Sequence, residues 1–175
     1  MKRLLILLLL GLCLPGTSQT FRLETVNDSL SWLVLQTDST KDRWELPYPV
    51  YQFQVGDVNG NGLCEAMVGV VKKTRFHREE GRRIFIFKNY RGKVRPLWMG
   101  SRLGGQLIDF RFLERPSGGG IIRALETGTD NHLFTVTDYH WEEFGMSFKR
   151  FIKKNINHQD NAYEIFLDNS TDPAD

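Results

Sequence analysis

Apolar and polar residues alternate with a period of two along most of the chain after residue 20. In segments 51–55, 108–112, 134–137 and 144–148, every second residue is apolar and the residues between are polar or small. Successive side chains of a β-strand point to opposite faces of its sheet, so this pattern predicts half-buried strands. No window shows the period of a convincing amphipathic helix.

Two segments, 66–71 and 84–87, are instead apolar at nearly every position. A strand that is apolar on both faces is typical of a sheet covered from both sides. We therefore expect these two strands in the interior, between layers.

Turn residues separate the strands at short intervals, which favours hairpins and an antiparallel arrangement. Segments 50–98 and 106–151 each read as four consecutive strands, and 21–35 adds further strand sequence. A closed propeller needs at least about four blades of four strands, more than this chain supplies. The predicted fold class is therefore all-β: antiparallel meanders forming propeller-blade-like units, packed as a sandwich or an incomplete propeller. A face-to-face sandwich is favoured over a ring completed by several protomers.

The N-terminus has the pattern of an export signal. Lys2 and Arg3 precede an apolar run that ends by Leu14, followed by Pro15 and small residues. The run is shorter than the roughly 20 apolar residues of a membrane span, so residues 1–18 are predicted to be a signal peptide. The expected location is the periplasm, the outer membrane or the extracellular space.

Cys13 leaves a second interpretation open. Residues 10–13 resemble a bacterial lipobox, in which the cysteine becomes lipidated, although Leu12 stands where a small residue is preferred. Soluble export is favoured, and a lipid anchor at Cys13 is the only membrane attachment we expect. The remaining chain divides into an all-β domain (21–154) and a polar C-terminal tail (155–175) with a disordered end.

Charge and cysteine content limit the function classes. The chain has 23 Lys and Arg against 21 Asp and Glu, and loss of Lys2 and Arg3 with a signal peptide makes these numbers equal. Such a neutral domain lacks the basic excess of a nucleic-acid-binding protein, so no nucleic-acid partner is expected. Without Cys13, Cys64 is the one cysteine left, and no intramolecular disulfide is expected.

Residues 57–65 carry oxygen-bearing side chains at relative positions that suit a calcium loop. The side chains of Asp57, Asn59, Asn61 and Glu65, with the Leu63 carbonyl, are the predicted ligands. Ca²⁺ takes about six to eight oxygen ligands from a tightly curved backbone. An EF-hand is excluded because its twelfth loop position would be Val68. The competing interpretation is a metal-free hairpin, since Asn-Gly occurs twice and is the strongest short turn signal.

The segment 55–68 resembles the calcium-loop signature of FG-GAP, or integrin-alpha-type, β-propeller repeats. That resemblance implies a Ca²⁺ ion held in a blade hairpin by Asp57, Asn59, Asn61, the Leu63 carbonyl and Glu65. In this chain the signature occurs once.

Catalytic motifs are lacking. The sequence has no His-Glu-x-x-His, no Gly-x-Ser-x-Gly and no phosphate-binding loop. We therefore predict a non-catalytic protein with a structural calcium loop, which binds an unidentified protein or glycan, or acts as a scaffold, at the bacterial cell envelope. Two alternatives stay open. One is a small envelope hydrolase using Asp138, His140 and Ser147, and the other is a glycan-binding module using Trp44, Tyr48 or Trp98.

Overall fold

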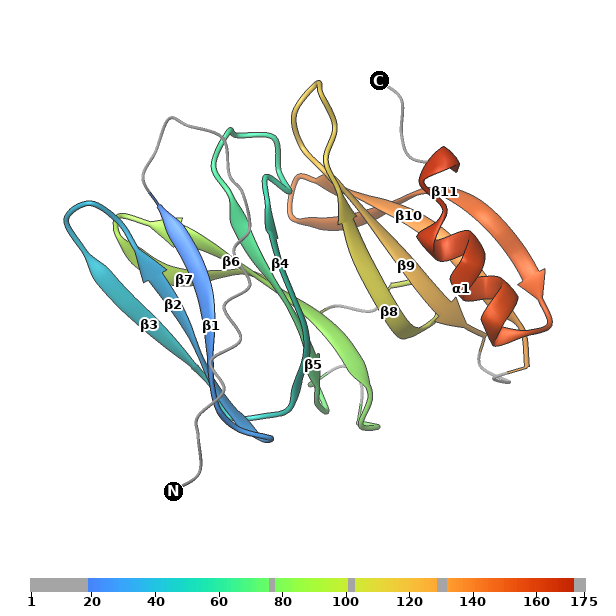
Figure 1. Cartoon of the computed structure of the whole chain (residues 1–175), viewed down its shortest axis with the longest axis horizontal. Coiled ribbons are helices and arrows are strands. Elements are labelled where there is room, and N and C mark those ends of the chain that lie inside the picture. The colour runs from blue at the N-terminus through green and yellow to red at the C-terminus, as the bar shows by residue number, and fades with distance from the viewer. Residues whose placement is uncertain (1–18, 76–77, 101–102, 129–131, 172–175) are drawn as a thin grey trace.

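Three antiparallel sheets lie side by side in the computed structural model, which describes residues 19–75, 78–100, 103–128 and 132–171 (Figure 1). The N-terminal sheet has the order β1-β2-β3, the middle sheet β4-β5-β6-β7 and the C-terminal sheet β11-β10-β9-β8. Each sheet is a meander in which consecutive strands pair. The predicted all-β antiparallel fold is therefore confirmed, and no closed barrel forms within the described residues.

The predicted four-strand units 50–98 and 106–151 correspond to the middle and C-terminal sheets, whereas a strand over 41–46 was not predicted. The N-terminal sheet contains β1 (Thr20–Asn27), β2 (Leu30–Gln36) and β3 (Lys41–Leu46). The middle sheet contains β4 (Val50–Gly56), β5 (Glu65–Val71), β6 (Arg82–Tyr90) and β7 (Lys93–Met99). The C-terminal sheet contains β8 (Gln106–Leu113), β9 (Ile121–Thr127), β10 (Phe134–Glu142) and β11 (Gly145–Ile156).

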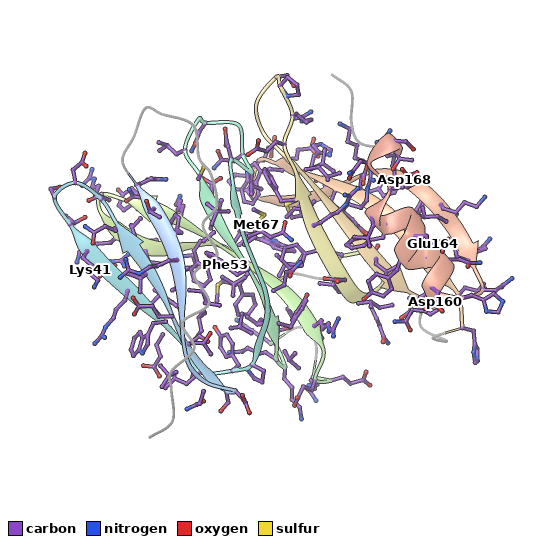
Figure 2. All side chains as sticks on the ribbon, in the orientation of Figure 1. Lys41, Phe53, Met67, Asp160, Glu164 and Asp168 are labelled. Carbon is purple, nitrogen blue, oxygen red and sulfur yellow. The ribbon has the colours of Figure 1, made fainter. Side chains whose placement is uncertain are left out.

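The middle sheet is buried on both faces. Phe53, Val68 and Phe85 belong to the core shared with the N-terminal sheet. Met67 and Ile86 belong to a second core, shared with the C-terminal sheet. Figure 2 labels Phe53 and Met67 within the middle sheet. The prediction that 66–71 and 84–87 form interior strands is thus confirmed, and the sheets pack face to face.

The expectation of no helix is wrong, because α1 (Gln159–Leu167) forms within the segment predicted to be a polar tail. Its buried residues are Ala162 and Phe166, four positions apart and so on one side of the helix. They pack with Leu125 and Val136 against the face of the C-terminal sheet that points away from the middle sheet. A short helix with so narrow an apolar stripe depends on this packing for its stability, which the sequence pattern does not reveal. Residues 172–175, expected to be disordered, lie outside the described residues.

A β-bulge interrupts the first strand of each four-stranded sheet. In β4 the register shifts between Val50 and Gln52, and in β8 between Leu107 and Asp109. The extra residues, Tyr51 and Ile108, therefore face the opposite side from that expected by simple alternation. Tyr51 packs toward the C-terminal sheet instead of joining Phe53.

The pairing register relates the middle and C-terminal sheets position by position. The last residue of the first strand faces the first residue of the second strand in both, Gly56 opposite Glu65 and Leu113 opposite Ile121. Glu65 and Ile121 are therefore equivalent positions. Equivalent pairs between the second and third strands follow from the same register and are listed here: Met67–Ile86 with Arg123–Asp138, Ala66–Phe87 with Ile122–Tyr139, Val68–Phe85 with Ala124–Thr137, and Val70–Arg83 with Glu126–Thr135.

The predicted signal segment 1–18, including Cys13, lies outside the described residues. Within the described ranges no helix is long and apolar enough to cross a membrane. Cys64 is disulfide-bonded in the structure, so the expectation that it forms no disulfide is wrong for this chain.

Candidate metal-binding loop

The loop between β4 and β5 curls around the carboxylate of Asp57. Asp57 Oδ1 accepts hydrogen bonds from the backbone N–H groups of Gly60 (2.7 Å) and Asn61 (3.1 Å), and Oδ2 accepts one from Gly62 (2.8 Å). Gly60 and Gly62 have φ values of 77° and 79°, in the left-handed region that favours glycine. The two Asn-Gly steps therefore produce the tight turn that the sequence predicts.

The two loop asparagines close further local turns. Asn59 Oδ1 accepts from the Asn61 N–H at 3.1 Å, and Asn61 Oδ1 accepts from the Leu63 N–H at 2.8 Å. The side-chain oxygens of Asp57, Asn59 and Asn61 thus all accept hydrogen bonds from backbone N–H groups of the same turn. These bonds also give the metal-free hairpin a complete hydrogen-bond network of its own.

Glu65 lies at the base of the loop and is only 1 % exposed. Its Oε2 accepts from the Val58 N–H at 2.9 Å, and its Oε1 accepts from Asn59 Nδ2 at 3.1 Å. Burial, opposed by the Val58 hydrogen bond and reinforced by the nearby charge of Asp57, raises the pKa of Glu65 to about 7. No basic side chain forms an ion pair with Glu65 in the described ranges.

The structure therefore brings most of the predicted ligands together. Asn59 contacts Glu65 through its side chain, and Asn61 contacts Asp57 through its N–H. Leu63 joins the turn through its own N–H, which donates to Asn61. Asn59 presents its amide nitrogen to Glu65, so ligation of a cation beside Glu65 would require this amide to rotate.

The loop contains few carboxylates for a metal site. No group of three or more His, Cys, Asp or Glu side chains that could hold a metal ion lies in the ranges the structure describes. A cation here would depend on amide and carbonyl oxygens besides the two carboxylates, which is compatible with the oxygen preference of Ca²⁺.

A second loop, residues 114–120 between β8 and β9, lies against the first. A Cβ atom built on Gly60 would lie 3.4 Å from the Gly119 backbone nitrogen. Arg115 holds this loop by donating to the carbonyls of Gly119 (Nε, 2.8 Å) and Gly118 (Nη2, 3.1 Å). A cavity of about 230 Å³ between the two loops is lined by Asp57 and Arg115, among others.

The proposed hydrolase relay does not assemble. Asp138 Oδ1 accepts from Arg123 Nε at 2.7 Å, and Oδ2 accepts from Arg150 Nε at 3.0 Å. His140 Nδ1 is buried and has no hydrogen-bond partner among the described residues, although Ser147 faces His140 across the strand pair. The Asp138 carboxylate is thus part of a buried ion-pair network and does not orient the histidine.

The three aromatic residues considered for glycan stacking pack into the cores. Trp98 is 8 % exposed. The Trp44 ring centroid is 5.7 Å from that of Phe87, and Tyr48 meets Phe85 edge-on, also at 5.7 Å. They do not form a flat exposed row.

One polar cluster was missed by the sequence-based reasoning. Glu126, Thr137 and Tyr139 are all buried on the face of the C-terminal sheet that points toward the middle sheet. The available signal was a glutamate on the face of strand 121–127 that also carries Ile122 and Ala124, together with the Gly104-Gly105 pair before β8.

Comparison with known proteins gives no relative: the chain matches no family model, no curated protein and no solved structure. The resemblance of the 57–65 loop to FG-GAP repeats therefore stays a prediction.

Proposed function

We propose that this is an exported, non-catalytic β-sheet protein that binds a partner or acts as a scaffold at the cell envelope, and that Ca²⁺ stabilises its β4–β5 loop. Asp57, Asn59, Asn61, Leu63 and Glu65 are the proposed calcium ligands. The observation that carries the proposal is the buried, unpaired carboxylate of Glu65.

The C-terminal sheet supplies an internal control for that carboxylate. Ile121, the residue equivalent to Glu65, is 0 % exposed. An apolar residue is therefore sufficient for the fold at this position. Burying a carboxylate without a cationic partner is unfavourable. A cation bound in the loop would remove that penalty, and it would give the glutamate a role that isoleucine cannot fill.

The loop chemistry suits Ca²⁺ in particular. The two carboxylates neutralise its charge, and the amide oxygens of Asn59 and Asn61 with the Leu63 carbonyl extend the oxygen set. Two carboxylates are few for a calcium site, so we expect an affinity in the range of extracellular sites, about 0.1 to 1 mM.

The proposed role of the ion is structural. Gly60 touches Gly119, so the calcium loop lies at the contact between the middle and C-terminal sheets. Fixing the loop would stabilise this contact. The proposed ligands all come from one loop and its flanking strand.

The proposals of export and of a binding role are supported by different observations. Export follows from the signal-like pattern of residues 1–18, and the proposed partner is a protein or glycan of the envelope. A binding role is preferred to hydrolysis because the Asp138 carboxylate is occupied by Arg123 and Arg150.

Calorimetric titration with Ca²⁺ tests the proposal. We expect one site in the wild-type protein, no detectable site in Asp57→Ala, and none in Glu65→Ile, which carries the residue of the equivalent position. Glu164→Gln, which removes an exposed acid of α1 away from the loop, is the matched control and should bind as the wild type does. Absence of calcium binding to the wild type at about 10 mM, well above the expected dissociation constant, would refute the calcium site.

A further inference from the structure

A cavity of about 430 Å³ opens on the C-terminal sheet beside its edge strand β11. Its lining includes Phe148 and Phe151, about half exposed at 52 % and 48 %, and three buried polar residues: Glu126 (2 %), Thr137 (1 %) and Tyr139 (4 %). The volume is within the range of small-molecule sites, roughly 300 to 1,000 Å³. Apolar walls around a few buried polar groups are the usual composition of such sites.

Hydrogen bonds fix the polar groups of the cavity in place. Tyr139 Oη donates to Glu126 Oε2 at 2.9 Å, while the Gly105 N–H donates to Glu126 Oε1 at 2.8 Å. The Gly104 N–H donates to Tyr139 Oη at 2.8 Å. A Cβ atom at Gly104 would lie 2.8 Å from the same oxygen, so a glycine is needed for this close approach. Burial, and next the Glu126 charge, raise the pKa of Tyr139 and keep its phenol protonated.

Hydrogen-bond acceptors outnumber donors in this cavity. The Glu126 carboxylate receives two hydrogen bonds where it could accept about four, and no basic side chain pairs with it in the described ranges. The Thr137 hydroxyl is buried and has no hydrogen-bond partner among the described residues, although it lies near enough to Tyr139 to lower the pKa of the phenol. The ligand that completes this set is therefore a cationic hydrogen-bond donor.

The fold itself does not impose the polar cavity. In the middle sheet, the equivalent residues are all apolar: Val70 for Glu126, Phe85 for Thr137 and Phe87 for Tyr139. All three are buried members of the core shared with the N-terminal sheet. The Tyr48 ring also packs on Phe85 there, whereas the register places Gly105 at the position equivalent to Tyr48. At these equivalent positions, apolar side chains fill the space in the middle sheet, whereas polar side chains line a cavity in the C-terminal sheet.

We propose that the cavity binds a primary ammonium group on an apolar stem, as in an alkylamine or a lysine side chain. The ammonium donates to Glu126 and Thr137, and the stem lies against Phe148 and Phe151. The aromatic walls suit the apolar stem. Lys154 Nζ of this chain already lies 4.4 Å from the Phe151 ring centroid, so the ammonium of the ligand is placed at Glu126 and not on this ring.

This inference names a ligand class for the proposed binding role, on which it rests in part, but it involves none of the calcium ligands. Loss of calcium binding would therefore leave it intact, and failure of amine binding would leave the calcium site intact.

The test compares two probes with the same stem, n-pentylammonium and 1-pentanol, titrated into ¹⁵N-labelled protein in an amine-free buffer. We expect pentylammonium to shift the Gly104 and Gly105 amide signals and to bind at least about tenfold more tightly than pentanol, because hydrogen bonds to charged groups are the stronger ones. Equal binding of both probes, or no shift at either glycine with about 20 mM pentylammonium, overturns the proposal.

Variants locate the ammonium. Glu126→Gln should weaken pentylammonium binding at least about tenfold, and Thr137→Val about threefold, with little effect on pentanol. Glu164→Gln, on the exposed side of α1 (Figure 2), is the matched control and should change neither affinity. If Glu126→Gln fails to fold, Phe151→Ala provides the test, because Phe151 is half exposed and its replacement should be tolerated. This variant should weaken the binding of both probes. Unchanged pentylammonium binding in Glu126→Gln, or unchanged binding of both probes in Phe151→Ala, overturns the proposal.

A third probe separates the two sources of the ammonium. Tighter binding of Nα-acetyl-lysine amide than of pentylammonium would identify a lysine side chain of a partner protein, because the backbone groups then add contacts. Weaker binding would identify a free amine.

Discussion

The β4–β5 loop of the middle sheet and the β8–β9 loop of the C-terminal sheet occupy equivalent positions, each between the first and second strands of its sheet. They are stabilised by side chains of opposite charge. In the β4–β5 loop, the Asp57 carboxylate accepts three backbone N–H groups. In the β8–β9 loop, the Arg115 guanidinium donates to two backbone carbonyls. A loop organised around a carboxylate can add a cation at its centre, whereas one organised around a guanidinium repels it. The comparison explains why we assign a metal to only one of two similar hairpins.

The central strands of the two sheets differ in the same way. Met67 and Ile86 form an apolar pair in the middle sheet, and the equivalent pair in the C-terminal sheet is Arg123 and Asp138. Met67 and Ile86 pack against the next sheet. Arg123 instead donates to Thr171 Oγ1 at 2.7 Å and to the Thr171 carbonyl at 2.8 Å. On the face that points away from the middle sheet, the C-terminal sheet meets no further sheet among the described residues (Figure 1). Polar contacts with the C-terminal turn, together with α1, cover this face.

The largest effect is expected from breaking the buried pair. Asp138→Ala leaves the buried guanidinium of Arg123 without its carboxylate partner, so the free energy of unfolding should fall by about 3 to 5 kcal/mol. Urea denaturation measures this change. The double variant Arg123→Met with Asp138→Ile, which copies the middle-sheet pair, should recover most of the loss. A double variant no more stable than Asp138→Ala would contradict the equivalence of the two sheets.

The next effect concerns the pH dependence of metal-free stability. The pKa of Glu65 is raised in the folded state from its ordinary value of 4.5 to about 7. Below pH 4.5 the charge of Glu65 therefore does not lower the free energy of unfolding. Between pH 4.5 and 7 the free energy of unfolding falls progressively, and above pH 7 the loss is complete, at most about 3 kcal/mol. Denaturation in EDTA across this range should show the decline, and Glu65→Ile should remove it. The same decline in Glu65→Ile would assign it to another group.

Glycine substitutions in the two loops should have smaller effects. Gly60→Ala and Gly118→Ala both place alanine at positive φ, which costs about 1 to 2 kcal/mol. A Cβ at Gly60 would meet Gly119 at ordinary van der Waals distance, 3.4 Å from its nitrogen, and a Cβ at Gly118 meets nothing within 4 Å. Thermal denaturation should therefore show similar losses of stability for the two variants. A clearly larger loss for Gly60→Ala would contradict this spacing of the two loops.

The smallest effect is expected from Arg115→Met. The half-buried guanidinium makes two hydrogen bonds within its own loop, so its loss should cost about 0.5 to 1.5 kcal/mol. Calcium affinity should rise slightly, because a cation near Asp57 is removed. Calorimetry on this variant measures both, and weaker calcium binding would contradict the proposed placement of the ion.

The period-two pattern and turn residues were sufficient to predict the two four-stranded meanders and the interior strands β5 and β6, because strand pairing between neighbours along the chain is local. Strand β3 was not predicted. The bulged Tyr51 and Ile108 were mispredicted, since a bulge shifts the alternation without altering the composition. Helix α1 was missed because its stability comes from the sheet beneath it. The candidate loop ligands were proposed from spacing within nine residues. Glu126, Thr137 and Tyr139 meet only through strand pairing, which no short sequence window contains.

The most direct test follows the carboxyl carbon of Glu65 by NMR during a pH titration, with and without saturating Ca²⁺. The account predicts a midpoint near pH 7 in the metal-free protein, in line with the raised pKa, and a midpoint well below that value with calcium, because a bound cation favours the charged carboxylate. A midpoint that calcium does not change would contradict the assignment of Glu65 as a ligand and, with it, the calcium-stabilised loop.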